Sequence, residues 1–454
     1  MTATLFRNRP VDHLPAGPAV RRPGRRRSLG LGLSSPSALR ALLVGLVLLS
    51  LCWGAFGGWA AAEHSSAASA LVTVDEPLSL DAQQMYEAIA DADATITAAY
   101  LASAQPSLQP LKRYQNDLAT ASADLSRLGA GDGSRAMAGS LAALNRGLPA
   151  YQGYVGQAQA EFAMGYPLTG GSFLQVASEE AHLVLLPAAN AVFTRENAAL
   201  SAASGEATAL PLVFVALALA LITAFVLYRA QRWLARRTNR MLSPGLVLAS
   251  LLLVISVIWL AVGFLSARSD LDRGIGHGSA PAESLALASI GVQQIRGDAV
   301  LNVISRSGNT SFSDDFQSVS KDVGPGPGSW LSTAAGAQQD TRSGAALVAD
   351  AARAAPAWYA ANAKVYALGG VADFNSEREA IVGTGFSYLN TVVGYDTLET
   401  DLDQAIAADQ AVFASAATQG AHALDSLAWV AIAASLLMAG GCGWAFSRRL
   451  AEYR

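Results

Sequence analysis

The sequence predicts an all-α membrane protein in which four transmembrane helices carry two helical regions outside the membrane. Four apolar segments each have roughly the 20 residues that a helix needs to cross a bilayer. Two long, alanine-rich regions with helical spacing lie between the first and second segments and between the third and fourth. The order of span, large region and span therefore occurs twice, which predicts an internal duplication.

The predicted organisation divides the 454 residues into nine segments. In order, they are a basic tail (1–38), a transmembrane helix (39–61), an outer region (62–208), a second transmembrane helix (209–228), a basic loop (229–242), a third transmembrane helix (243–266), a second outer region (267–425), a fourth transmembrane helix (426–446) and a short tail (447–454). The tails and the loop are too short for a catalytic domain, so we expect no enzyme on that side of the membrane.

Arginine clusters orient the predicted helices. They adjoin the apolar segments and comprise Arg21, Arg22, Arg25, Arg26, Arg27, Arg40, Arg229, Arg232, Arg236, Arg237, Arg240, Arg448, Arg449 and Arg454. The positive-inside rule then predicts a plasma-membrane protein with both termini in the cytoplasm and both outer regions outside. We expect these arginines to contact anionic lipid and not nucleic acid, since no folded nucleic-acid-binding element accompanies them.

The first apolar segment also has features of a cleaved signal peptide. Arginines precede it, and Ala60, Ala61 and Ala62 offer a cleavage site of small residues. The segment is longer than a typical signal sequence and begins only at Leu39, which favours a retained membrane anchor. Both interpretations remain open.

The first outer region is predicted to be an antiparallel four-helix bundle. Its first helix, capped by Ser79 or Asp81, has an apolar stripe formed by Met85, Ile89, Ala92, Ile96 and Ala99. Pro106 and Pro110 interrupt the pattern. Three more helices are expected over 111–128, over 135–164 and from Ser172 towards the second span, with Gly170 and Gly171 in a turn between helices.

Two local matches support the duplication. The pair Asp93-Ala94 recurs as Asp298-Ala299, each about sixteen residues after a proline. The triplet that begins at Pro149 recurs at Pro356, with an aromatic residue third in each. The second outer region therefore repeats the plan of the first, starting with a helix after Pro281.

The sequence contains no pattern typical of a metal or cofactor site. Its histidines are scattered, and its glycine-rich segments lack the Lys-Ser/Thr pair of a phosphate loop. Both cysteines, Cys52 and Cys442, fall in predicted spans, so no disulfide joins the outer regions. We therefore expect no cofactor, no metal and no catalytic residues.

Two groups of residues are candidates for contacts with a ligand or a partner. The outer candidates are Glu87, Asp91, Asp93, Arg296, Asp298 and Trp330, and the cytoplasmic output candidates are Arg229, Arg232, Arg236, Arg237 and Arg240. For the charged outer residues the alternative is an ordinary solvated helix face, and for Trp330 it is a cap on the bundle. Helix continuity from the first span through Val74, and into the fourth span from Phe413, would transmit a shift across the membrane.

The layout and two short motifs resemble the GlnX-like transmembrane relay proteins of actinobacteria. The motifs are Ala92-Asp93-Ala94 and Leu186-Pro187-Ala188-Ala189, which are also similar to four-helix sensor modules of chemoreceptors. The resemblance implies a relay between a GlnH-like solute-binding lipoprotein outside and a PknG-like Ser/Thr kinase inside, reporting amino-acid status.

We therefore expect a sensor or relay without enzymatic activity, in which a homodimer is one open arrangement. The alternative is a membrane scaffold of an envelope complex. A transporter is disfavoured, because the spans carry few ionisable groups and offer instead Gly54, Gly57 and Gly58 in the first and Gly440, Gly441 and Gly443 in the fourth.

Overall fold

The computed structural model describes residues 35–238, 244–305, 311–323, 326–337, 344–368, 378, 381 and 391–451. Within these ranges the ordered elements are helices and no strand occurs. Four helices are long and apolar enough to cross a membrane. The predicted all-α membrane class with four spans is confirmed.

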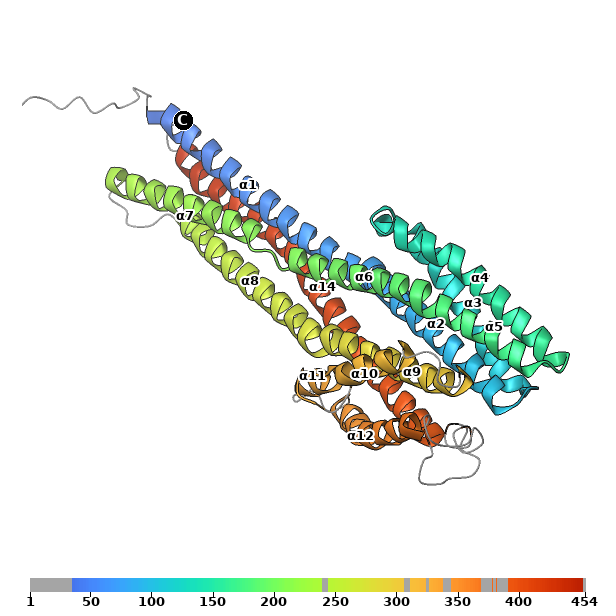
Figure 1. Cartoon of the computed structure of the whole chain (residues 1–454). Helices are drawn as coiled ribbons and strands as arrows, with labels where there is room; N and C mark the ends of the chain where they lie inside the picture. Colours follow the sequence, from blue (N-terminus) through green and yellow to red (C-terminus); the bar gives the residue numbers. More distant parts are fainter. Residues whose placement is uncertain are drawn as a thin grey trace, which may run out of the picture.

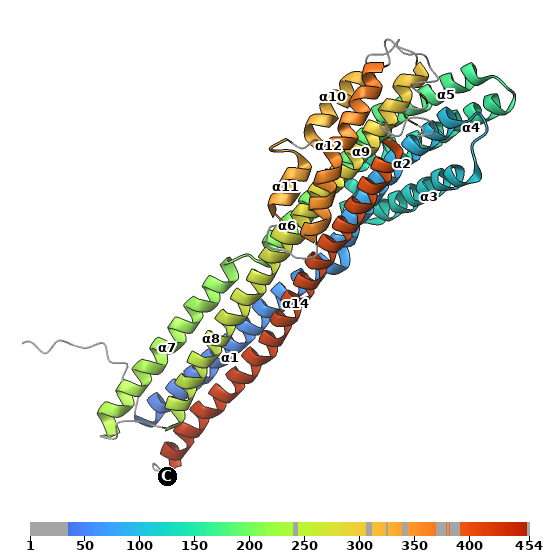
Figure 2. The same ribbon diagram turned by 90° about the horizontal axis from the view of Figure 1, so that it is seen from below.

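The four span helices lie together at one end of an elongated molecule, and the other helices form a head at the opposite end (Figures 1 and 2). They are α1 (Ser35–Ala70), α7 (Pro211–Thr238), α8 (Pro244–Gly274) and α14 (Thr391–Ala451). Helix α14 packs along both α1 and α8. Both outer regions therefore project from the same end of the spans.

Glycine allows the span helices to approach closely at two places. A Cβ added to Gly54 of α1 would overlap Ser435 of α14. A Cβ on Gly245 of α8 would lie 2.6 Å from the carbonyl oxygen of Gly441. By contrast, Gly440 has no atom within 4 Å of such a Cβ, so only part of the glycine set serves helix packing.

Three of the spans continue into the head without a break in the helix. Helix α1 passes through a π-helical turn, η1 (Leu71–Asp75), into α2 (Glu76–Ala102). Helix α8 passes through η4 (Ile275–Ser279) into α9 (Ala280–Ser305), and α14 itself extends from the head through the membrane segment. Only α7 is separated from its head helix, by a short break at residues 208–210.

The first half of the head is completed by four further helices and two short helical turns. They are α3 (Leu108–Ala130), η2 (Asp132–Arg135), α4 (Ala138–Ala163), α5 (Pro167–Glu180), η3 (Ala181–Leu185) and α6 (Leu186–Ala207).

One expected turn in this half is misplaced. Gly170 and Gly171 lie inside α5, where a Cβ on Gly170 would meet the ring of Phe162 at 2.8 Å. The chain turns instead at Gly165, whose φ of 85° is the left-handed conformation that glycine adopts easily.

The second half contains α10 (Ser311–Val323), α11 (Trp330–Ala337) and α12 (Gly344–Leu368) beside α9 and α14. Pro149 in α4 and Pro356 in α12 are both inside helices, and the aromatic residues two positions later, Tyr151 and Trp358, are both buried. The π-helical turns η1 and η4 precede α2 and α9 in the same way. These correspondences fit a duplicated unit.

The two halves share one hydrophobic core. A single cluster of buried residues runs from Ile89 and Phe193 of the first half to Ile295 and Leu402 of the second. Because buried side chains of both halves belong to this one cluster, the head is one folded body.

Candidate functional site at the contact between the two halves

Helices α2 and α9 come close together where the two halves meet. A Cβ added to Gly297 of α9 would lie 3.9 Å from the Cα of Ala94 in α2. Small residues at this point let the two backbones approach, so the side chains next to them, Asp93 and Asp298, are brought to the same contact. The residues that repeat in the sequence thus meet in space.

Asp93 is held in the core by hydrogen bonds from two other helices. The Tyr151 hydroxyl of α4 donates to its Oδ1 at 3.2 Å, and the Ser178 hydroxyl of α5 donates to its Oδ2 at 2.5 Å. Burial, followed by the neighbouring Asp93 carboxylate, raises the pKa of Tyr151 well above its ordinary value, so the hydroxyl keeps its proton. The two donors compensate part of the cost of burying a carboxylate.

His182 bridges the aspartates of the two halves. Its Nε2 lies 3.6 Å from Asp93 Oδ2, and its Nδ1 lies 3.7 Å from Asp298 Oδ1. The histidine belongs to the π-helical turn η3, which rotates the chain between α5 and α6 and points this residue at the contact. A shift of one half against the other would change both distances.

The alternative that the charged outer residues form a solvated helix face is wrong for three of them. Asp91, Asp93 and Asp298 are 6%, 2% and 0% exposed. Helix α2 carries alanine on every face, so the sequence does not mark which face is covered. Helices α3, α4 and α5 contact its acidic residues, through Arg113, Tyr151 and Ser178. Trp330 is half-buried against the core at the start of α11, which agrees with a capping role.

Arg113 ties α3 to both halves. Its Nε and Nη2 donate to the two carboxylate oxygens of Asp91 at 2.6 and 3.0 Å, and Nη2 also reaches Glu399 of α14 at 2.5 Å. The Tyr395 hydroxyl donates to the same Glu399 carboxylate at 2.9 Å. This ion-pair cluster is a second polar link across the contact.

Further carboxyls lie beside this cluster, and burial raises the pKa of two of them. Burial raises the pKa of Glu87 to about 8, despite a hydrogen bond from Gln83, and neighbouring carboxylates including Asp403 add to the rise. Burial and then the charge of Glu399 raise the pKa of Asp403 to about 6. Among the described residues, no group of three His, Cys, Asp or Glu side chains is arranged to hold a metal ion.

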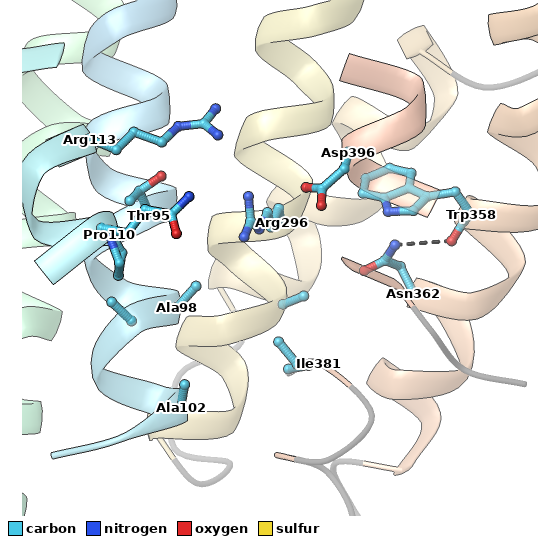
Figure 3. A pocket seen from close by; sticks show the side chains of 13 residues that line it. Thr95, Ala98, Ala102, Pro110, Arg113, Arg296, Trp358, Asn362, Ile381 and Asp396 are labelled. Atoms are coloured by element: carbon cyan, nitrogen blue, oxygen red, sulfur yellow. Dashed lines mark hydrogen bonds between the residues drawn. The ribbon is translucent and has the colours of Figure 1, made fainter. Parts of the chain in front are cut away.

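A cavity of about 390 Å³ opens between the halves, next to Arg113 and at the end of α2 far from the spans (Figure 3). Its walls come from α2, α3, α9, α12 and α14, together with Ile381. They comprise Thr95, Ala98, Ala99, Ala102, Gln109, Pro110, Arg113, Arg296, Ala299, Trp358, Asn362, Ile381 and Asp396. Its volume lies within the usual range for small-molecule sites, roughly 300–1,000 Å³.

Of the outer candidates, Arg296 alone lines this cavity, while Asp91 lies behind Arg113. The residues that sequence reasoning missed are Arg113, Tyr151, Ser178, His182 and Glu399. Each is a single polar residue in an otherwise ordinary helical pattern, and only the packing of distant helices brings them together. The one available signal was the repeated aromatic position that contains Tyr151.

The output candidates lie at the opposite end of the molecule. Arg229, Arg232 and Arg236 on α7 border a hollow of about 520 Å³ that is also lined by Leu42 and Trp233. The Arg237 side chain and the whole of Arg240 lie outside the described residues. Three of the five arginines therefore share one surface beside α1.

Comparison with protein families matches residues 67–205 to an actinobacterial sensor domain. The match begins near the end of α1 and ends in α6, so it covers the first half of the head and includes Asp93, Tyr151, Ser178 and His182. Comparison with curated proteins and with solved structures gave no match. The family match supports a sensor-like actinobacterial protein with a sensing or signalling role.

Proposed function

We propose that the chain is a transmembrane signal relay whose head binds an extracytoplasmic ligand or a ligand-loaded solute-binding lipoprotein. The signal passes through the spans to a cytoplasmic partner, for which a Ser/Thr kinase that controls amino-acid metabolism is the specific candidate. In this proposal the membrane is the plasma membrane, with both termini in the cytoplasm, and the protein has no catalytic activity of its own.

The observation that carries this proposal is the continuity of helices between the contact of the two halves and the membrane. α2, α9 and α14 all take part in that contact, and each continues as a membrane helix. A helix transmits an axial shift or a rotation with little loss along its length. Movement at the contact therefore reaches the far side of the spans.

The polar groups at the contact supply a reason why the two halves of the head can adopt two relative arrangements. His182 joins the two halves, at 3.6 Å from Asp93 and 3.7 Å from Asp298, and a cavity elsewhere along the contact leaves space between the halves. A ligand that fits one arrangement better than the other shifts the population towards it. The π-helical turns η1 and η4, which lie between span and head, are the places where the helices can adjust.

The proposed orientation follows from charge. The exposed arginines Arg229, Arg232 and Arg236 lie at the end of the spans opposite the head, and the positive-inside rule assigns that end to the cytoplasm. The hollow beside them is then the surface that a cytoplasmic partner would contact. No folded domain of this chain competes for it among the described residues.

The relay is tested by measuring whether the cytoplasmic ends of α1 and α14 move when the head is loaded. Spin labels are attached through Arg40→Cys and Ser447→Cys in a chain that also carries Cys52→Ser and Cys442→Ala. The distance between the two labels is measured in nanodiscs under two conditions. In the first, a mixture of the proteinogenic amino acids is added alone; in the second, solute-binding lipoproteins from the same cells are added with it. We expect the distribution of distances to shift.

Two variants of the head serve as a matched pair in that experiment. Ala98→Phe fills the cavity and is expected to abolish or imitate the shift, whereas Leu168→Phe on the exposed surface of α5 leaves the response intact. An unchanged distance under every condition would refute the relay and favour the scaffold, which binds partners without a conformational response.

A further inference from the structure

We propose that the cavity between the halves is a binding site for a small organic carboxylate that also carries an amino or hydroxyl group. The protein would then bind its ligand directly, between α2 and α3 on one side and α9, α12 and α14 on the other. The inference rests on the relay described above and names the chemistry of its ligand.

Arg296 supplies the main anion contact. Its guanidinium carbon lies 4.1 Å from the centre of the Tyr395 ring, which orients the side chain, and it has no ion pair within the described ranges. Figure 3 shows the side chain pointing into the cavity from α9. A half-buried guanidinium that stacks on an aromatic ring keeps its planar fork of donors available for a carboxylate.

The charges around the cavity limit the ligand to low negative charge. Arg113 also lines it, but Asp91 and Glu399 already occupy its Nε and Nη2. Asp396 contributes another carboxylate to the wall. A dianion such as phosphate would meet more acidic groups than free cations, whereas one carboxylate is matched by Arg296 with help from Nη1 of Arg113.

Asp396 explains why the ligand should carry a second polar group. It projects towards the cavity from α14, opposite α2 (Figure 3). Among the described residues it takes part in no ion pair. Asn362 donates its amide to the carbonyl oxygen of Trp358 at 3.0 Å, so its own side-chain oxygen can still accept a hydrogen bond. These acceptors suit an ammonium or hydroxyl group of the ligand.

The remaining wall is apolar and sets the size of the ligand. Ala98, Ala99 and Ala102 of α2 line one side, and Ala299 of α9 and Trp358 of α12 line the other. A short aliphatic body fits between them, and the space of about 390 Å³ leaves room for ordered water beside it. Because a ligand held by Arg296 and α2 contacts both halves, its binding energy depends on their relative position.

The test is direct binding to the purified full-length chain in nanodiscs by isothermal titration calorimetry. Three probes share one carbon skeleton: leucine, 2-hydroxy-4-methylpentanoate and the unsubstituted 4-methylpentanoate. Glutamate and inorganic phosphate test the charge limit. We expect the amino or hydroxy acids to bind with a Kd below about 1 mM, and the unsubstituted acid and phosphate to bind at least about tenfold more weakly.

Variants identify the groups that bind. Arg296→Gln is expected to weaken carboxylate binding by at least about tenfold, because a charge-assisted pair is lost. Asp396→Asn, at an exposed position where folding is not at risk, should remove the preference for the amino or hydroxy acid. Arg353→Gln, on the exposed side of α12 and paired with Asp350, is the control and should leave binding unchanged.

Three results would overturn the inference. They are the absence of binding by every carboxylate probe, phosphate binding as tightly as the carboxylates, and wild-type affinity in Arg296→Gln. If no probe binds but the labels on α1 and α14 still respond to a lipoprotein, the direct site is refuted and the relay stands. If probes bind but the labels do not move, the site stands and the relay is refuted.

Discussion

The two hydrogen bonds that hold Asp93 give the sharpest test of the contact between the halves. A hydrogen bond to a charged group contributes about 1.5–3 kcal/mol. The bond from Ser178 measures 2.5 Å and that from Tyr151 measures 3.2 Å, so we assign the upper end of this range to Ser178 and the lower end to Tyr151. Ser178→Ala should therefore lower the free energy of unfolding by about 3 kcal/mol and Tyr151→Phe by about 1.5 kcal/mol.

Both substitutions remove a hydroxyl with little change of shape, so the loss reports the hydrogen bond more than the packing. The assay is chemical denaturation of the full-length chain in detergent, followed by tryptophan fluorescence. Tyr154→Phe is the matched control, because Tyr154 lies on the same helix, is half-buried against the same core and has no hydroxyl hydrogen bond among the described residues. A loss below about 0.5 kcal/mol in Ser178→Ala, or equal losses in the two tyrosine variants, would refute the reasoning.

Two further predictions concern pH and the spans. The pKa of Glu87 rises from 4.5 to about 8 on folding, so the folded state holds a proton that the unfolded chain loses; stability should fall as pH rises from 4.5 to about 8. Glu87→Gln should flatten this dependence of the melting temperature and Glu161→Gln on α4 should not, and an equally steep profile in Glu87→Gln would contradict the assignment. In the spans, Gly245→Ala should destabilise by about 1–3 kcal/mol in thermal unfolding, because its Cβ would lie 2.6 Å from a backbone oxygen. Gly440→Ala, with nothing within 4 Å, should be neutral, and equal effects of the two would show that the packing is wrong.

Much of the fold was predictable because each span is a local property of the chain. An apolar run of sufficient length must be helical in lipid, since its backbone has no other hydrogen-bond partners there. The bounds of one head helix were also approximately predictable: α3 was expected over 111–128 and extends over Leu108–Ala130. Pro110 did not break this helix because it lies in the first turn, where the missing donor is not required.

The site was only partly predictable, for a reason visible in α2. The sequence selected Asp93 and Asp298 by their repeated position, and both are at the contact between the halves. It could not show that they are buried, because α2 carries alanine on every face and so lacks the polar and apolar sides that mark a covered surface. Arg113 and His182 were missed because their partners lie on other helices, distant in the sequence.

The sequence by itself therefore determined the spans and the helical class, since these depend on apolar length and helical periodicity, and its repeated residues predict a duplication. Only the tertiary structure decided that the two halves share one core, that Asp93 and Asp298 face His182 across it, and that Arg296 lines a cavity. Such contacts join residues from different helices, and their geometry follows from how small side chains such as Ala94 and Gly297 let those helices approach.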